Sequence, residues 1–142
     1  MMSGTRKPKP APALLIVMFK QKISVADLSA AARETALQNG AAIAYDPSEG
    51  EIARRILKET EGGFDNIVDF AGNEKSMAFA VSVLARGGKI VVSGLMGGNF
   101  SLPMVQWIYK RLTIEGFMPE RAGMLTILSC CNGPGASIFC LP

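Results

Sequence analysis

The chain has 142 residues, of which 49% are hydrophobic and 19% are charged, and its formal net charge is +3. This length suits one globular domain with a real core. Arg6, Lys7 and Lys9 lie in the proline-rich start, so the rest is nearly neutral and has no basic stripe for nucleic acid. The absence of histidine removes the commonest general base and a common zinc ligand.

The first 22 residues combine basic and apolar side chains, as a signal peptide does. Lys20 and Lys22, however, stand where the small residues of a cleavage site belong. The apolar run over residues 14–19 is far too short to span a membrane. We therefore expect a cytoplasmic protein with no membrane partner, and a disordered leader over residues 1–12, which offer nothing to bury.

Beyond the leader, apolar runs alternate with amphipathic ones. The sequence predicts strands over residues 22–26, 41–45, 66–70, 89–93 and 112–117. It predicts helices over residues 29–39, from Ser48 to Gly62, over residues 73–86 and over residues 103–110. Apolar strands that alternate with amphipathic helices indicate an α/β fold with a doubly wound parallel sheet, which we place in residues 13–118.

Short polar and glycine signals set the expected ends of the helices. Gly40 suits the C-terminal end of the first helix, and Ser48 and Glu51 have the spacing of a capping box before the second. We expect Gly87 and Gly88 to end the third helix. After the next strand, we expect Gly94 to face a ligand and the pair at 97–98 to serve only as a turn.

Residues 119–142 carry neither helical nor strand periodicity, so we expect an irregular tail there. Three cysteines, Cys130, Cys131 and Cys140, lie in this segment. An odd number with an adjacent pair suits neither a disulfide framework nor a CxxC metal site. We interpret them as reduced thiols, which agrees with a cytoplasmic location.

Asp27 is the most informative side chain, because it directly follows the first strand. A carboxylate there can accept both ribose hydroxyls of an adenosine and repel a 2′-phosphate. The alternative is that Asp27 serves only as a turn or cap residue before the helix at 29–39. The spacing alone favours neither reading.

Three segments, in this order, resemble the cofactor domain of medium-chain, zinc-type alcohol dehydrogenases: ISVADLSAAARETALQNGAAIAYDPSE, FDNIVDFAGNEKSMAFAVSVLARGGKIVVSGLMGG and LPMVQWIYKRLTIEGF. The resemblance covers residues 23–118 and implies oxidation of an alcohol, or reduction of a carbonyl, with NAD. It places Asp27 at the adenosine ribose and Leu28 beside the adenine. It also places Ala71 and Gly72 under the adenosine half, Ser93, Gly94 and Leu95 beside the nicotinamide, and Phe117 and Met118 at its carboxamide.

The chain also departs from this family. Family members often carry a basic residue five positions after the acidic one, where this chain has Ala32 and, one step later, Arg33. The first strand and its G-x-G-x-x-G turn, which holds the pyrophosphate, have no counterpart. Residues 14–19 lie too close to the next strand for a parallel crossover, so they correspond either to the end of a helix or to an antiparallel edge strand.

The resemblance also implies a catalytic domain with zinc ligands, which this sequence does not contain, so we expect no zinc and no catalytic residues in this chain. The main hypothesis is a partial NAD(P)-binding domain that is not catalytically competent alone and binds the dinucleotide weakly or not at all. The alternatives are an interaction module or accessory subunit that pairs through exposed sheet edges, and an incomplete product that folds poorly. By resemblance, residues 112–117 would form a homodimer interface, although they could equally be a covered or merely short edge strand.

Overall fold

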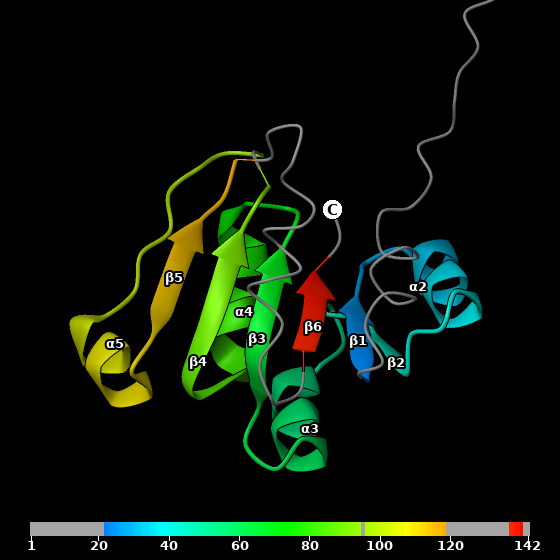
Figure 1. Cartoon of the computed structure of the whole chain (residues 1–142), viewed down its shortest axis with the longest axis horizontal. Coiled ribbons are helices and arrows are strands. Elements are labelled where there is room, and N and C mark those ends of the chain that lie inside the picture. Colours follow the sequence, from blue (N-terminus) through cyan, green and yellow to red (C-terminus); the bar gives the residue numbers. More distant parts are fainter. Residues whose placement is uncertain (1–21, 95, 119–136, 141–142) are drawn as a thin grey trace, which may run out of the picture.

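The computed structural model describes residues 22–94, 96–118 and 137–140, which form an α/β structure around one sheet (Figure 1). The strands are β1 (Ile23–Ala26), β2 (Ile43–Tyr45), β3 (Phe64–Asp69), β4 (Leu84–Val92), β5 (Thr113–Gly116) and β6 (Ser137–Cys140). The helices are α2 (Ala30–Gln38), α3 (Ile52–Glu59), α4 (Glu74–Val83) and α5 (Met104–Lys110). The predicted alternation of strands and helices is therefore confirmed from β1 to β5.

The sheet has six strands in the order β2-β1-β6-β3-β4-β5, and every described pair is parallel. This order is that of a doubly wound sheet, whose strands run 3-2-1-4-5-6. The position of the first strand is taken by β6, which comes last along the chain and lies between β1 and β3 in Figure 1. The prediction of a Rossmann-like sheet is confirmed.

The expectation of an irregular tail is wrong for residues 137–140. β6 pairs with Ile23–Ala26 on one side and with Asn66–Asp69 on the other. Four residues are too few to show strand periodicity, and β6 follows a segment rich in glycine and proline. Residues 137–140 form a strand because the facing edges of β1 and β3 offer backbone hydrogen bonds on both sides, not because of a local sequence pattern.

The core lies on the two faces of the sheet. Neighbouring residues of a strand point to opposite faces, and Val25 packs with Ala36 of α2, whereas Ala26 belongs to the larger cluster with residues of α3 and α4. This larger cluster contains the fully buried side chains of Ile56, Phe64 and Ile90, among others. Helix α2 therefore covers the face opposite to α3 and α4, as in a doubly wound fold.

Two of the predicted helix ends are wrong. The Ser48–Glu51 capping box does not form: Glu51 lies at the N-cap of α3 with a φ of 63° and makes no capping hydrogen bond. The Ser48 side chain instead donates to the Asp46 carboxylate, because Asp46 competes for it within the turn. The third helix ends at Val83, and Gly87 and Gly88 lie within β4, at a register shift against β3.

Candidate functional site

The carboxyl ends of the parallel strands form one edge of the sheet, and the residues predicted for a cofactor site lie along it. Asp27 and Leu28 follow β1, Ala71 and Gly72 follow β3, Ser93 and Gly94 follow β4, and Phe117 and Met118 follow β5. Leu95 lies outside the described residues. Ligands of open α/β sheets bind at this edge, next to the position where the strand order reverses.

Of the two roles weighed for Asp27 from the sequence, the structure contains the turn role, and the ribose role stays a prediction. Asp27 lies at the end of β1, and its Oδ1 accepts a hydrogen bond of 2.7 Å from the Ser29 N–H. Ser29 is in turn the N-cap of α2. Asp27 is only 4% exposed, whereas Leu28 beside it is 69% exposed. The carboxylate therefore organises the turn into α2, and Leu28 presents the open apolar surface.

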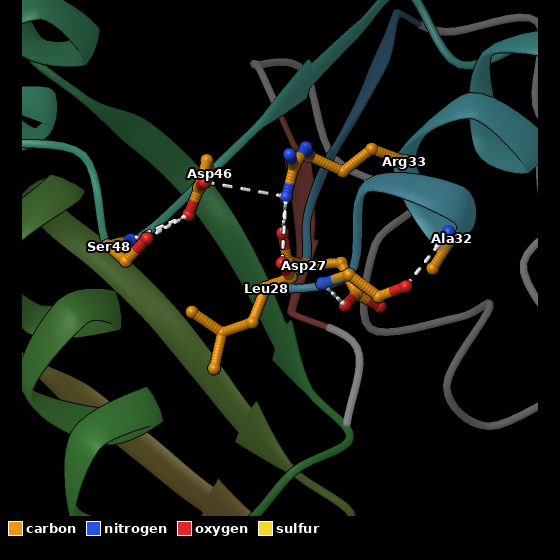
Figure 2. Close-up of polar contacts among 7 residues, drawn as sticks. Asp27, Leu28, Ala32, Arg33, Asp46 and Ser48 are labelled. Atoms are coloured by element: carbon orange, nitrogen blue, oxygen red, sulfur yellow. Dashed lines mark hydrogen bonds and ion pairs between the residues drawn. The ribbon is translucent and has the colours of Figure 1, made fainter.

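Arg33 ties the end of β1 to the loop after β2 (Figure 2). Its Nη1 donates to the carbonyl oxygens of Asp27, at 2.7 Å, and Leu28, at 3.0 Å, and lies 3.6 Å from Oδ2 of Asp46. The guanidinium thus turns from α2 back toward the strand ends. Ala32, at the position where the family often has a basic residue, only donates its backbone N–H to the Ser29 hydroxyl.

Asp46 is held in place by Ser48. The Ser48 N–H and hydroxyl donate to Asp46 Oδ1 at 2.9 and 2.6 Å, which leaves Oδ2 to face Arg33. These hydrogen bonds, followed by the charge of Arg33, hold the pKa of the Asp46 carboxyl below its usual range. Asp46 is therefore an ionised, oriented carboxylate at neutral pH.

The turn after β3 is organised by Asp69, which is completely buried. Its Oδ1 accepts hydrogen bonds from the N–H groups of Ala71, at 2.9 Å, and Gly72, at 3.2 Å. Its Oδ2 accepts a hydrogen bond of 2.7 Å from the Ser76 hydroxyl, and Ser76 forms a capping box with Asn73 at the start of α4. One carboxylate thus fixes both the turn and the first turn of the helix.

Gly72 and Gly94 bring the turns after β3 and β4 into direct backbone contact. A Cβ on Gly94 would lie 2.3 Å from the carbonyl carbon of Ala71, and one on Gly72 would lie 2.1 Å from the carbonyl oxygen of Gly94. Contacts this short to backbone atoms leave room only for glycine. The structure therefore gives Gly94 a packing role that the sequence reading, which assigned it to a ligand, did not include.

A cavity of about 640 Å³ opens at this edge of the sheet. It is lined by the end of β1, the loop after β2, the start of α4 and the loop after β4, namely by Ala26, Leu28, Pro47, Ser48, Ala71, Asn73, Glu74, Lys75, Ser76, Phe79, Met96, Gly97 and Gly98. Its volume is within the usual range for small-molecule sites, which are mostly apolar with a few polar groups. The chemistry of the lining suits a flat, partly polar ligand.

The structure brings together only some of the predicted residues. Leu28 and Ala71 line the cavity. Asp27 and Gly72 lie between lining residues along the chain but are not part of the lining themselves, and neither are Ser93, Gly94, Phe117 and Met118. Gly97 and Gly98, which we expected to act only as a turn, belong to the lining, and the Gly97 N–H donates to the Gly72 carbonyl at 3.1 Å.

The sequence reading missed several residues of this site. Asp69, Asn73 and Ser76 had a recognisable signal, since an acidic residue ends an apolar strand and a polar pair follows at capping spacing. Asp46 and Ser48 had an Asx-turn pattern, which was interpreted as a capping box. The apolar lining by Phe79 and Met96 had no signal, because it depends on how α4 and the loop after β4 fold over the sheet.

Comparison with known proteins relates this geometry to one family. The model of a family described as zinc-binding dehydrogenase matches residues 14–124. The chain belongs to the zinc-binding dehydrogenase family. The prediction made from the three segments is therefore confirmed.

A curated protein similar to this chain extends well beyond the part that matches. L-threonine 3-dehydrogenase of Caldanaerobacter subterraneus subsp. tengcongensis is 30% identical over 91 residues, which are 63% of this chain and 26% of that protein. The chain thus spans about a quarter of the length of this curated relative.

Solved structures of zinc-binding dehydrogenases share the fold. The alcohol dehydrogenase of Aeropyrum pernix has a TM-score of 0.70 at 20% identity, with 84% of this chain and 35% of that chain covered. A structure from Sinorhizobium meliloti, described as a zinc-binding dehydrogenase bound to NADP, has a TM-score of 0.63 at 16% identity, with 84% and 46% covered. At these identities the likeness concerns the fold.

The residues present do not fit the zinc that the family name implies. A catalytic zinc needs three protein ligands, commonly histidine and cysteine, and the sequence contains no histidine. In the part of the chain that the structure describes, no three metal-binding side chains gather into a potential site.

None of the described helices is long and apolar enough to cross a membrane.

Proposed function

We propose that this chain is a partial NAD(P)-binding domain of an alcohol dehydrogenase-like oxidoreductase, and that it is not catalytically competent alone. The cavity at the carboxyl ends of β1 and β3 is the observation that carries this proposal. The cofactor, when bound, would supply or accept a hydride. The residues of this chain would hold its adenosine half.

The lining of the cavity fits an adenosine. Leu28 and Phe79 offer apolar surface for the flat adenine, and the Ser48 side chain adds a polar group at the wall. Asp27 directly follows β1 and precedes the lining residue Leu28, at the position where an acidic residue binds a ribose in doubly wound folds. Because its Oδ1 already accepts from the Ser29 N–H and Asp27 is only 4% exposed, a ribose would have limited access to the carboxylate, which favours weak binding.

The remaining predicted contacts belong to this proposal as well. Ser93, Gly94 and Leu95 would border the nicotinamide, and Phe117 and Met118 would offer backbone groups to its carboxamide. The sequence has no G-x-G-x-x-G turn for the pyrophosphate. We therefore propose that binding is weak and that this chain alone transfers no hydride.

Calorimetric titration of the full chain with NADH and with 5′-ADP tests this proposal. Weak binding of 5′-ADP, with little additional affinity for NADH, is expected because the adenosine cavity is present and the pyrophosphate turn is not. Leu28→Asp should abolish binding of both nucleotides, since it places a charge against the adenine. Leu37→Asp, at an exposed position of α2, is the matched control. Micromolar binding of NADH, or no binding of 5′-ADP, would contradict the proposal.

A second candidate function is an interaction module that pairs with a second copy of this chain. Five apolar residues of the short helix α5 are 41% to 74% exposed, namely Met104, Val105, Trp107, Ile108 and Tyr109. β5, which directly follows α5, is an edge strand of the described sheet. An apolar helix face beside an open strand edge is typical of sites where a further chain adds to a sheet.

The oligomeric state tests this candidate. The wild-type chain should elute as a dimer in size exclusion with light scattering, and Ile108→Glu should shift it to a monomer, because burying a charge in an apolar interface is unfavourable. Leu37→Glu, on exposed surface of α2, should leave the dimer intact. A wild-type chain that is still monomeric at about 100 micromolar, a concentration at which a dimer with a micromolar dissociation constant would be mostly formed, would refute the pairing.

A further inference from the structure

We propose that Asp46 is a specificity-determining residue, which withholds Arg33 from the 2′-phosphate of an NADP-type nucleotide and so biases the cavity toward nucleotides with a free 2′-hydroxyl. This inference rests on the proposed nucleotide binding at the cavity. It assigns the discrimination to a charged pair formed by Arg33 of α2 and Asp46 of the loop after β2, in addition to Asp27.

The position of the pair is the first step of the argument. Arg33 and Asp46 face each other (Figure 2), and each is hydrogen-bonded to a residue that lines the cavity: Arg33 donates to the Leu28 carbonyl, and the Ser48 hydroxyl donates to Asp46. In doubly wound folds the ribose lies at the end of this second strand of the fold, and an arginine nearby accommodates a 2′-phosphate. β1 occupies that position in the strand order. Arg33 is therefore within the region where a 2′-phosphate would lie.

The orientation of Arg33 is the second step. Its Nη1 is held by two backbone carbonyls at 2.7 and 3.0 Å, so the guanidinium is already fixed at the strand end. A guanidinium carries five N–H donors, so a group that is held through one nitrogen can still offer others to phosphate oxygens. Arg33 thus has the chemistry and the placement of a phosphate-binding residue.

Asp46 opposes this use of Arg33. Its Oδ2 lies 3.6 Å from Nη1 of Arg33, and Ser48 fixes the carboxylate in that direction. The negative charge neutralises the arginine and would also repel a doubly charged phosphate at the same place. Removal of this charge should change relative affinity roughly tenfold.

Asp46→Asn is the sharpest variant, because the amide oxygen can still accept the two hydrogen bonds from Ser48 while the charge is lost. We would titrate the full chain with adenosine 2′,5′-bisphosphate and with 5′-ADP and compare the ratio of their dissociation constants. The ratio should move roughly tenfold toward the 2′-phosphorylated probe. Glu49→Gln is the matched control, since Glu49 lies in the same loop but pairs with Arg55 at 2.8 Å. It should leave the ratio unchanged.

A double variant separates the role of Arg33 from a general charge effect. Adding Arg33→Gln to Asp46→Asn should abolish the gain, whereas Arg33→Lys should keep part of it, with melting temperatures confirming that both variants fold. If both probes bind and the ratio does not move in Asp46→Asn, or if the gain persists without Arg33, the inference is wrong and the proposed function stands. If neither probe binds to any variant, both are wrong.

Discussion

Ile138→Pro tests the central place of β6. In the described sheet, β6 has a neighbour on each side, with Ile138 in register with Ser24 of β1 and Ile67 of β3. Whichever way its N–H points, proline removes a ladder hydrogen bond and leaves a carbonyl without a donor in mid-sheet. The lost bond costs about 1 kcal/mol and the orphaned buried carbonyl about 1–3 kcal/mol. We expect the free energy of unfolding to fall by about 2–4 kcal/mol in total.

Ala44→Pro is the matched control for this change. The Tyr45 carbonyl accepts from the Asp27 N–H, directly after β1. The preceding residue, Ala44, therefore directs its own N–H to the open side of the edge strand β2. That proline should cost less than about 1 kcal/mol, since no ladder bond is lost. Urea unfolding followed by circular dichroism measures both variants. An Ile138→Pro protein as stable as Ala44→Pro would refute the central placement of β6.

Three further changes test the packing described above. Gly94→Ala should lower the free energy of unfolding by about 1–3 kcal/mol, because the added Cβ would collide with the backbone of Ala71 and Gly72. Gly50→Ala, where the added Cβ meets nothing within 4 Å, should leave urea unfolding unchanged. Burial, and then the hydrogen bond to Glu59, raise the pKa of Tyr45 to about 12. The folded state therefore holds the Tyr45 proton more tightly than the unfolded state does. The resulting contribution to the free energy of unfolding is complete below pH 10 and should be lost as the pH rises toward 12. Tyr45→Phe should flatten this loss in urea unfolding measured at several pH values. Lys110→Met should lower the melting temperature by several degrees, since the ammonium group donates to two carbonyls at the end of α4.

Most of the sheet could be predicted from local pattern. The apolar runs of β1, β3 and β4 and the periodicity of Met77, Ala80 and Val81 in α4 gave the elements and their parallel arrangement. The cap of α2 at Ser29 followed from residue type. These features depend on neighbours along the chain, which a sequence displays directly.

The rest depended on contacts between distant segments. The sequence offers nothing to show that residues 137–140 lie between β1 and β3, because their partners are more than 60 residues away in the chain. Likewise, the turn at Gly72 leaves no room for a side chain at Gly94, and Asp46 faces the guanidinium of Arg33. Both contacts are made only in the folded state. The expected capping box between Ser48 and Glu51 is absent, because the Ser48 N–H and hydroxyl donate to Asp46 instead.

The place of β6 has a consequence for how the protein forms during translation. Its strand is made after all the others that the structure describes, yet β1 and β2 reach β3, β4 and β5 through it. As the polypeptide leaves the ribosome, the two halves can form early helices, strand pairs and core contacts, but one continuous sheet cannot form until residues 137–140 have emerged. Contacts between segments so far apart slow folding, and the unjoined edges are exposed to other chains in the meantime. A nascent chain arrested shortly before this strand should therefore depend on chaperones far more than the released protein does.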